Sequence, residues 1–399
     1  MKEKEKEKEN LNKLSLKSIA ISGFKSFDGE EHVIRFGDIT VLIGANGAGK
    51  SNVVSFFKML GLMAAGALQQ YVGEQGFANS LLHCGAKKTP AIKAKLEFEN
   101  ETYSYQYEFA LEHTATDSLV FTREIVSVID KSNAERKEKL VLQAWDKESR
   151  LDNALDDRAN IPFKTTHHAI HVTPAIPVIP GLLEGFKVYQ FHDTSSASRI
   201  RTSGYINEHE LASDGGNLAA FLYGLKENEN TKPHYEKIVR HIAQVFPQFG
   251  DFDLKPAARN DNYIMLDWRE KNNEYKFGAH QISDGTLRFM ALAALLLQPP
   301  QSLPPVIILD EPELGLHPTA IAALAGMAKD ASQHAQVVLA TQSPSLLDEF
   351  RADQVIVVER DPIARSSLFK KHSAEELKVW LADYALSEIW DKNILGGNP

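Results

Sequence analysis

The sequence predicts an α/β protein with a mostly parallel core sheet flanked by helices, an antiparallel β-rich lobe and a helical insert. Buried apolar strands alternate with helices over residues 281–399, which is typical of a parallel sheet. Over residues 91–130 the apolar period changes to two, which indicates an antiparallel sheet with one face in water. A glycine-rich loop follows a short β-branched run at residues 39–43 and precedes a helical pattern.

These patterns also suggest the domain organisation. We expect residues 1–15 to form a charged flexible tail and residues 16–399 to form a single head. Within the head, the core lobe would comprise residues 16–90 and 281–399, and the β-rich and helical insert would comprise residues 91–280. The chain of 399 residues is long enough to bury a substantial core, and its 43% hydrophobic content is ordinary for a globular protein.

The first half of the chain reads mainly as strands. A strand and then a turn are expected over residues 16–27, and further strands at 32–36 and 39–43. A helix at 50–72 and an irregular stretch at 73–90 follow. Further strands are expected at 92–98, 103–111 and 119–128, then a charged turn at 131–139 and a strand at 140–145.

The second half returns to alternating strands and helices. A strand is expected at 187–191, helices at 215–225 and 234–245, and a hairpin of strands at 263–268 and 274–277. An apolar helix at 282–297 follows, then a strand at 306–309, a helix at 318–331, a strand at 336–340, a short helix at 343–350, a strand at 354–359 and a closing helix at 374–386.

The loop after residues 39–43 carries the strongest chemical signal. It reads Gly44-Ala45-Asn46-Gly47-Ala48-Gly49-Lys50-Ser51, a complete G-x-x-x-x-G-K-[ST] pattern. Its glycines let backbone N–H groups approach phosphate oxygens, Lys50 reaches the β- and γ-phosphates, and the Ser51 hydroxyl binds Mg²⁺. A structural glycine turn is the alternative, but the flanking strand and helix favour a nucleotide-binding P-loop NTPase.

Two acidic residues end the strand at 306–309. Asp310 would be delivered beside the phosphate loop to hold Mg²⁺ with Ser51, and Glu311 would orient or deprotonate the attacking water. The pair could instead cap the next helix, and only its combination with the upstream phosphate loop makes the catalytic interpretation strong.

A third candidate element is the start of the apolar helix, Ile282-Ser283-Asp284-Gly285-Thr286. Ser283 is a typical N-cap, and a small, glycine-containing helix start can bind an anion. Alone this pattern indicates only a helix cap. Its position one helix before the acidic strand supports its interpretation as part of an anion-binding site.

The order GANGAGKSN, ISDGT, ILDEPELGLHP and LATQSP, with GFKSF before the phosphate loop, resembles the ABC-type ATPase heads of the SMC, RecF and OLD families. The likeness covers residues 16–72 and 281–358. The segments FHDTS and SDGGNLAAFL and the C-terminal tail are similar to those of a compact bacterial group, the AAA_21-type predicted ATPases.

The resemblance implies the cofactors ATP and Mg²⁺ and a head-to-tail pair of heads. ATP bound to one head is capped by the signature helix of the other, so a homodimer or a higher even oligomer is expected. The residues implied to bind ATP are Gly44, Asn46, Gly47, Ala48, Gly49, Lys50, Ser51 and Asn52 in one copy, and Ser283, Asp284, Gly285 and Thr286 in its partner.

The sequence departs from the family pattern in three places. Gln342 stands where histidine is usual, so it can sense the γ-phosphate without carrying charge, and slow hydrolysis is expected. The signature reads SDGT, which favours the SMC, RecF and OLD side over transporters. Either Gln190 or His192 could serve as the glutamine-loop residue, and the sequence does not decide between them.

Other features exclude several function classes. The net charge of −9 argues against general nucleic-acid coating, although a local basic patch would still allow DNA contact. His167, His168 and His171 lack the Cys or carboxylate that would complete a metal-binding spacing. The single cysteine suits a reducing cytoplasm, and no apolar run is long enough to span a membrane.

Two functions remain in strong competition. The first is an ATPase that switches a separately encoded effector, a Toprim-like nuclease or a toxin, in bacterial anti-phage defence. The second is a RecF-type DNA-repair ATPase, and a transporter motor fits poorly. Because no acidic nuclease motif follows the ATPase core, we expect no nuclease activity in this chain. The effector role rests on family analogy alone.

Overall fold

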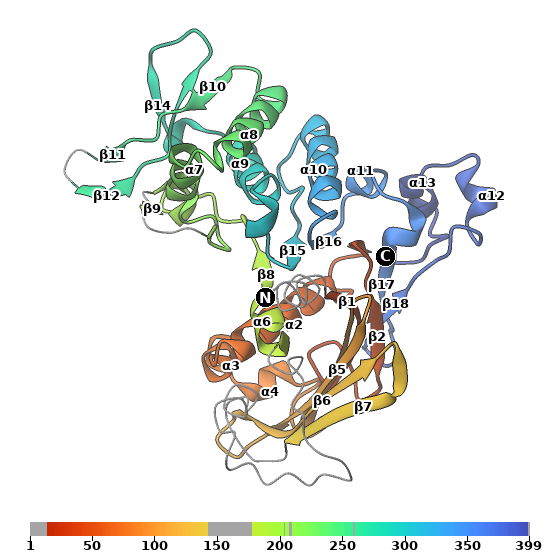
Figure 1. The fold of residues 1–399 in the computed structure, drawn as a ribbon. Helices are drawn as coiled ribbons and strands as arrows, with labels where there is room; N and C mark the ends of the chain where they lie inside the picture. The colour runs from red at the N-terminus through yellow and green to blue at the C-terminus, as the bar shows by residue number, and fades with distance from the viewer. Residues whose placement is uncertain (1–13, 143–177, 203, 207–209, 258–259, 398–399) are drawn as a thin grey trace. The chain divides into compact units, whose positions relative to one another are not determined.

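The computed structural model describes residues 14–142, 178–202, 204–206, 210–257 and 260–397 (Figure 1). The chain forms two compact units and enters each of them three times. Unit 1 consists of Met1–Gly37, Asn46–Phe186 and Val358–Lys370, and unit 2 of Asp38–Ala45, Lys187–Val357 and Lys371–Pro399.

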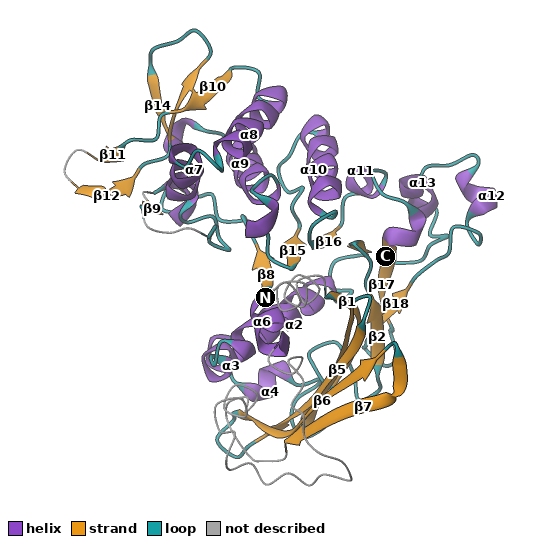
Figure 2. Ribbon diagram, viewed as in Figure 1, coloured by secondary structure: helices purple, strands orange, loops and turns teal. Residues whose placement is uncertain are grey.

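Unit 1 contains a six-stranded antiparallel sheet with strand order β2-β1-β4-β5-β6-β7 (Figure 2). The strands are β1 Ser15–Ser22, β2 His32–Arg35, β4 Ala91–Glu99, β5 Tyr103–His113, β6 Leu119–Asp130 and β7 Asn133–Leu142. Side chains of β4 alternate between buried and more exposed positions, so the expected sheet with one solvated face is confirmed. β1 begins at Ser15, one residue inside the predicted tail.

The predicted charged turn at 131–139 is wrong, because β7 occupies most of it. The chain reverses between Asp130 and Asn133, and β7 then pairs antiparallel with β6, with Val128 opposite Glu138. β7 stands last in the strand order of this sheet, next to β6. Pairing with β6 therefore overrides the turn-like composition.

The helices of unit 1 lie beside this sheet (Figure 2). They are α2 Lys50–Ala64, α3 Leu68–Glu74, α4 Ala78–Leu81 and α6 Val178–Glu184. The single helix predicted over 50–72 is broken, because the chain turns at Gly66, whose φ of +69° favours glycine. α3 begins within the predicted helix and extends two residues beyond it, and α4 falls in the stretch 73–90, for which irregular structure was expected.

The other six-stranded sheet has strand order β18-β17-β3-β16-β15-β8. Its strands are β3 Ile39–Ile43, β8 Phe186–Tyr189, β15 Val306–Asp310, β16 Gln336–Thr341, β17 Val355–Arg360 and β18 Ser367–Lys370. β3 pairs in parallel with both β16 and β17, and β16 pairs in parallel with β15. Every residue of β3, β15 and β16 is buried, as expected for a parallel sheet covered on both faces.

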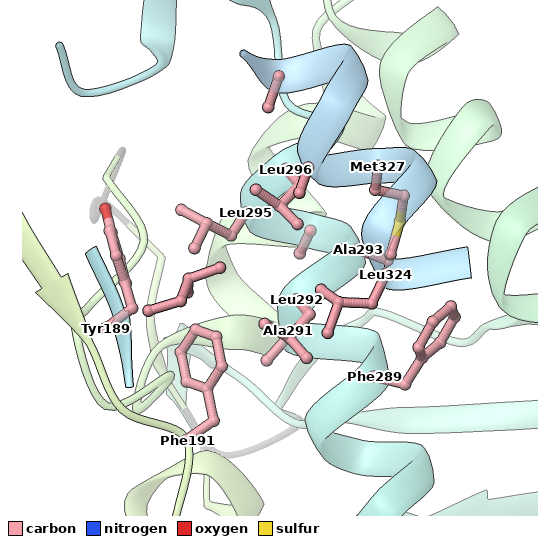
Figure 3. Packing of buried hydrophobic residues seen from close by; sticks show 14 of the residues in the cluster. Tyr189, Phe191, Phe289, Ala291, Leu292, Ala293, Leu295, Leu296, Leu324 and Met327 are labelled. Carbon is pink, nitrogen blue, oxygen red and sulfur yellow. The ribbon is translucent and has the colours of Figure 1, made fainter. Parts of the chain in front are cut away.

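Helix α9 forms the centre of the core of unit 2. The helices of this unit before residue 371 are α7 Leu218–Glu227, α8 Lys232–Val245, α9 Asp284–Leu296, α10 Pro318–Ala331 and α11 Pro344–Leu347. α9 is apolar almost all round and packs against α7, α8 and α10. Figure 3 shows Ala293 and Leu296 of α9 close to Leu324 and Met327 of α10, and Leu295 on the side of α9 that faces Tyr189. Burying each leucine contributes about 1.5–3 kcal/mol. This packing therefore holds α9 in place, together with the signature motif at its start.

Short strands complete unit 2. They are β9 Gly204–Tyr205, β10 Phe249–Phe252, β11 Pro256–Ala257, β12 Asn260–Ile264, β13 Asp267–Glu270 and β14 Lys276–Gly278. The predicted hairpin exists as β13 and β14, with Trp268 opposite Phe277. β12 is not part of it and pairs instead with β9 and β11.

The predicted closing helix at 374–386 is also wrong. Two short helices stand there, α12 Lys378–Leu381 and α13 Leu386–Asp391. All residues between Leu377 and Leu386 are exposed, so a continuous helix would have no apolar stripe to bury. Within the described residues, no helix is long and apolar enough to cross a membrane.

Candidate functional site

The carboxyl ends of three neighbouring strands of unit 2 meet at one edge of the parallel sheet. Thr341 of β16 lies opposite Ile43 of β3, and Ala340 lies opposite Asp310 of β15. The phosphate loop therefore starts, at Gly44, at the same edge where the acidic pair and Gln342 follow their strands. Ligands of open α/β sheets bind at this edge.

In unit 1, the phosphate loop continues with two glycines in the left-handed region. Gly47 has φ +78° and Gly49 has φ +122°. A Cβ atom on Gly49 would lie 1.9 Å from Ser367 Oγ, a distance that no real contact allows, whereas nothing lies within 4 Å of the corresponding position on Gly47. Gly49 is therefore required for both its conformation and its close approach to Ser367.

Two buried serines, Ser26 and Ser367, connect distant segments to the phosphate loop, and we call them the serine relay. Asn52 Nδ2 donates to Ser26 Oγ over 2.7 Å, and the two serine oxygens lie 2.7 Å apart. Ser367 Oγ also donates to the carbonyl oxygen of Ala48 over 2.6 Å. Both serines are almost inaccessible to solvent, so these hydrogen bonds fix the loop without competition from water.

Three positive side chains lie in the phosphate loop, in contact with it, or beside helix α2 that follows it. α2 begins at Lys50, whose side chain is only 5% exposed, and lysine is rarely so buried unless its charge is compensated. Arg360 Nη1 donates to the carbonyl oxygen of Gly47 over 3.3 Å. Lys25 donates to Ser55 and Gln75, and its burial lowers the pKa of its amine. Arg360 is distant in sequence from the loop, and no motif pointed to it.

At the acidic edge in unit 2, both candidate glutamine-loop residues contact Asp310. Gln190 Nε2 donates to Asp310 Oδ2 over 2.8 Å. His192 Nε2 lies 2.9 Å from the backbone oxygen of Asp310. Only Gln190 reaches the carboxylate itself, and therefore only Gln190 is placed to orient the predicted metal ligand.

Glu311 has a φ of +45°, in the left-handed region that disfavours ordinary side chains. Such conformations cost about 1–3 kcal/mol and often occur at functional sites. The backbone N–H of Glu311 donates to the backbone oxygen of Ala340 over 2.8 Å, and Gln342 Nε2 donates to Glu311 Oε1. The structure thus places the two predicted catalytic side chains of unit 2, Glu311 and Gln342, in direct contact.

Glu313 is a residue of this edge that sequence reasoning missed. Its Oε1 accepts hydrogen bonds from Thr341 Oγ1 at 2.5 Å and from the backbone N–H of Gln342 at 3.2 Å. Burial raises the pKa of the Glu313 carboxyl. The only sequence signal was a second glutamate two positions after Glu311.

The start of α9 has the N-cap predicted for it. Ser283 Oγ accepts from the backbone N–H of Thr286 at 3.2 Å and lies 2.8 Å from the hydroxyl of Thr286. Asp284 is exposed, and its hydrogen bond with Arg201, 2.6 Å long, lowers the pKa of its carboxyl. A Cβ on Gly285 would lie 2.2 Å from the backbone oxygen of Gly315, so this glycine allows α9 to approach the turn after β15.

Arg288, one turn further along α9, connects this helix to two other segments. It donates to the backbone oxygens of Phe191 and His192 at 3.0 and 2.8 Å, and to that of Leu314 at 2.9 Å. The signature helix, the His192 segment and the turn after Asp310 are thereby joined within unit 2. Arg288 lies outside the predicted motif.

The donor set suits a magnesium nucleotide. A serine hydroxyl and a carboxylate, as offered by Ser51 and Asp310, are the hard oxygen ligands that Mg²⁺ prefers. The part of the chain that the structure describes contains no group of three or more His, Cys, Asp or Glu side chains that could hold a metal. The pairing of Ser51 with Asp310 stays a prediction, and His167, His168 and His171 lie outside the described residues.

Residues 39–348 match the family AAA_21, described as "AAA domain, putative AbiEii toxin, Type IV TA system". The match begins at β3 and ends at α11, so it includes the phosphate loop, the signature helix and the acidic edge. Comparison with curated protein sequences gives no match.

Two solved structures of SMC heads share the fold. The first is an Smc head bound to the C-terminal winged-helix domain of ScpA, with 16% identity and a TM-score of 0.51 over 90% of this chain and 99% of that chain. The second is a Pyrococcus furiosus Smc head domain with an extended coiled coil, bound to the C-terminal domain of ScpA, with 16% identity and a TM-score of 0.50 over 93% and 99%. At this identity the likeness establishes the fold, that of an ABC/SMC-type ATPase head.

Proposed function

The chain belongs to the AAA_21 family, and we propose that it hydrolyses ATP slowly in a dimer of heads and thereby regulates a separately encoded effector in bacterial anti-phage defence. The observation that carries the ATPase part is the shared strand edge. There, the start of the phosphate loop, the Asp310–Glu311 pair and Gln342 follow neighbouring strands.

Each residue has a proposed role in this reaction. Lys50 and the backbone amides of the phosphate loop bind the phosphates, and Ser51 and Asp310 hold Mg²⁺. When bound, Mg²⁺ neutralises phosphate charge. Glu311 orients or deprotonates the attacking water, and Gln342 holds the Glu311 carboxylate through its amide. Because Gln342 cannot carry charge, it contributes less to charge stabilisation than histidine would, which supports slow hydrolysis.

The proposed dimer uses the start of α9. Ser283 and Asp284 are exposed there, and together with Gly285 and Thr286 they would complete the ATP site of a partner copy. ATP would then bridge two surfaces, and hydrolysis would remove the bridging charge. A homodimer or a higher even oligomer follows from this arrangement.

The effector part rests on the family description and on what related heads bind. The two SMC heads are bound to domains of a second protein, ScpA, and the family is described as a putative AbiEii toxin of a Type IV TA system. We propose a cytoplasmic partner of this chain that supplies the destructive activity, a Toprim-like nuclease or a toxin.

The ATPase proposal is tested by measuring ATP binding and hydrolysis by the wild-type chain and by Lys50→Ala. We expect wild type to bind ATP and release phosphate slowly, and Lys50→Ala to lose binding because it removes the cation that contacts the β- and γ-phosphates. Equal ATP affinity of the two proteins would refute the assigned phosphate site.

The effector proposal is tested by affinity purification of the tagged protein expressed from its native locus. Recovery of a stoichiometric partner with acidic metal-ligand motifs or toxin activity supports the proposal. Recovery of the chain alone, or with DNA, contradicts it and favours a RecF-type repair ATPase.

A further inference from the structure

We propose that Glu313 is a positioning residue that fixes the end of β16, so that Gln342 can hold the catalytic side chain of Glu311. This inference rests on the proposed ATPase function and adds a residue to its machinery. Glu313 itself is not expected to contact ATP or the attacking water.

The turn after β15 holds Glu313 in a defined place. The backbone N–H of Leu314 donates to the backbone oxygen of Glu311 over 3.1 Å, and that of Leu316 donates to the backbone oxygen of Glu313 over 3.0 Å. Arg288 of α9 also donates to Leu314, as described above. Because the backbone on both sides is fixed, only the side chain of Glu313 has to be ordered for the carboxyl to act as an anchor.

The Glu313 carboxyl contacts the end of β16 at two points. Its Oε1 accepts from the Thr341 hydroxyl and from the backbone N–H of Gln342. Thr341 Oγ1 in turn accepts from the backbone N–H of Ser343 over 2.9 Å. One carboxyl oxygen therefore sets the conformation of three consecutive residues, Thr341 to Ser343.

The middle residue of these three contacts Glu311. Gln342 Nε2 donates to Glu311 Oε1, so any rotation of the Gln342 backbone would move its amide away from the carboxylate. Misplacing a catalytic group by 1 Å can cost about 100-fold in rate. By holding the Gln342 backbone, Glu313 therefore also holds the carboxylate of the catalytic Glu311 in place.

In this arrangement the Glu313 carboxyl has to act only as a hydrogen-bond acceptor. Its Oε2 is buried and has no hydrogen-bond partner among the described residues, a state that favours a protonated carboxyl. Burial raises the pKa of Glu313 in agreement with this. Glutamine has the same shape and the same acceptor oxygen, so it should take over the hydrogen-bonding role of Glu313. Alanine has no acceptor in its side chain and should not.

The experiment compares Glu313→Gln and Glu313→Ala in the full chain. ATP affinity is measured with a fluorescent ATP analogue, and kcat is measured by phosphate release. We expect Glu313→Ala to lower kcat by roughly 10- to 100-fold with unchanged ATP affinity, because the phosphate loop keeps its own contacts. Glu313→Gln should keep a kcat close to that of wild type.

Two further comparisons separate positioning from loss of stability. Thr341→Val removes the hydroxyl that donates to Glu313 at almost equal volume and should lower kcat. Thr341→Ser keeps the hydroxyl and should have a kcat close to that of wild type. This pair tests the positioning role if Glu313→Ala does not fold. Glu124→Ala is the matched control, because Glu124 is a buried glutamate of unit 1 that accepts from the Tyr107 hydroxyl at 2.8 Å. It should lower the melting temperature and leave kcat unchanged.

The possible failures are distinguishable. A folded Glu313→Ala variant with the kcat of wild type, or a Glu313→Gln variant as impaired as Glu313→Ala, overturns the inference and leaves the proposed ATPase intact. A wild-type chain that does not hydrolyse ATP, or a Lys50→Ala variant that hydrolyses it normally, refutes the proposed function and the inference together.

Discussion

The phosphate loop and the acidic edge are held in place by different chemistry. In unit 1, neutral hydroxyls of the serine relay and a glycine without space for a side chain fix the loop. In unit 2, amides and a buried carboxyl fix Asp310 and Glu311. The comparison teaches that nucleotide binding and hydrolysis have separate supports. Changes at the first support should lower ATP affinity and leave kcat at saturating ATP unchanged, and changes at the second should lower kcat and leave ATP affinity unchanged.

The strongest way to break the first support is Gly49→Ala. The added Cβ would collide with Ser367 Oγ, and the backbone would have to keep a φ of +122°. We expect ATP affinity to fall by more than about 100-fold, since the loop cannot keep its shape. Isothermal titration calorimetry with ATP measures this.

Gly47→Ala is the matched control, because its Cβ would meet no atom within 4 Å and only its φ of +78° is unfavourable. Its loss of affinity should be clearly smaller. Equal losses in the two variants would show that packing against Ser367 does not matter.

The second support is tested by comparing Gln190→Ala with His192→Ala. Gln190 contacts the Asp310 carboxylate, whereas His192 contacts the backbone oxygen of the same residue. Loss of a group that orients a metal ligand typically costs about 10- to 100-fold in metal affinity or activity. We therefore expect Gln190→Ala to raise the Mg²⁺ concentration required for half-maximal hydrolysis, and His192→Ala to leave it nearly unchanged. The reverse result would assign the glutamine-loop role to His192.

The smallest effect is expected for Ser367→Ala. This change leaves the Ala48 carbonyl oxygen without its buried donor, at a cost of about 1–3 kcal/mol in the free energy of unfolding. A modest, few-fold loss of ATP affinity should accompany the loss of stability, while kcat at saturating ATP stays unchanged.

Thermal unfolding with and without ATP measures both effects of Ser367→Ala. Ser366→Ala is the control, because Ser366 is also buried but hydrogen-bonds Asp28. It should lower stability and leave the ATP-induced shift intact. If Ser366→Ala reduced that shift as much as Ser367→Ala, the serine relay would have no special role.

The sequence predicted the parts of the fold and site that local patterns determine. The glycine loop, the acidic strand end and the Ser283 cap each lie within a few consecutive residues, and their strands and helices form where expected. The charged strand β7 was mistaken for a turn because pairing with β6 outweighs its composition. The closing helix predicted at 374–386 is divided in two, because its middle has no buried face.

The supporting residues could not be predicted for a related reason. Ser367 follows the phosphate loop by more than three hundred residues, and only the folded chain brings its hydroxyl to Ala48. The sequence could not show whether Gln190 or His192 is the glutamine-loop residue. Both contact Asp310, and only the folded chain shows that Gln190 contacts the carboxylate and His192 the backbone oxygen. Glu313 carries no motif of its own, and its role depends on the conformation at the end of β16.

The most direct test of separate supports is Glu311→Gln, studied by light scattering with and without ATP and by single-turnover hydrolysis. The account predicts that this variant binds ATP as tightly as wild type, stops hydrolysing it and accumulates as an ATP-bound dimer. Hydrolysis at the wild-type rate, or loss of ATP binding together with hydrolysis, would contradict it.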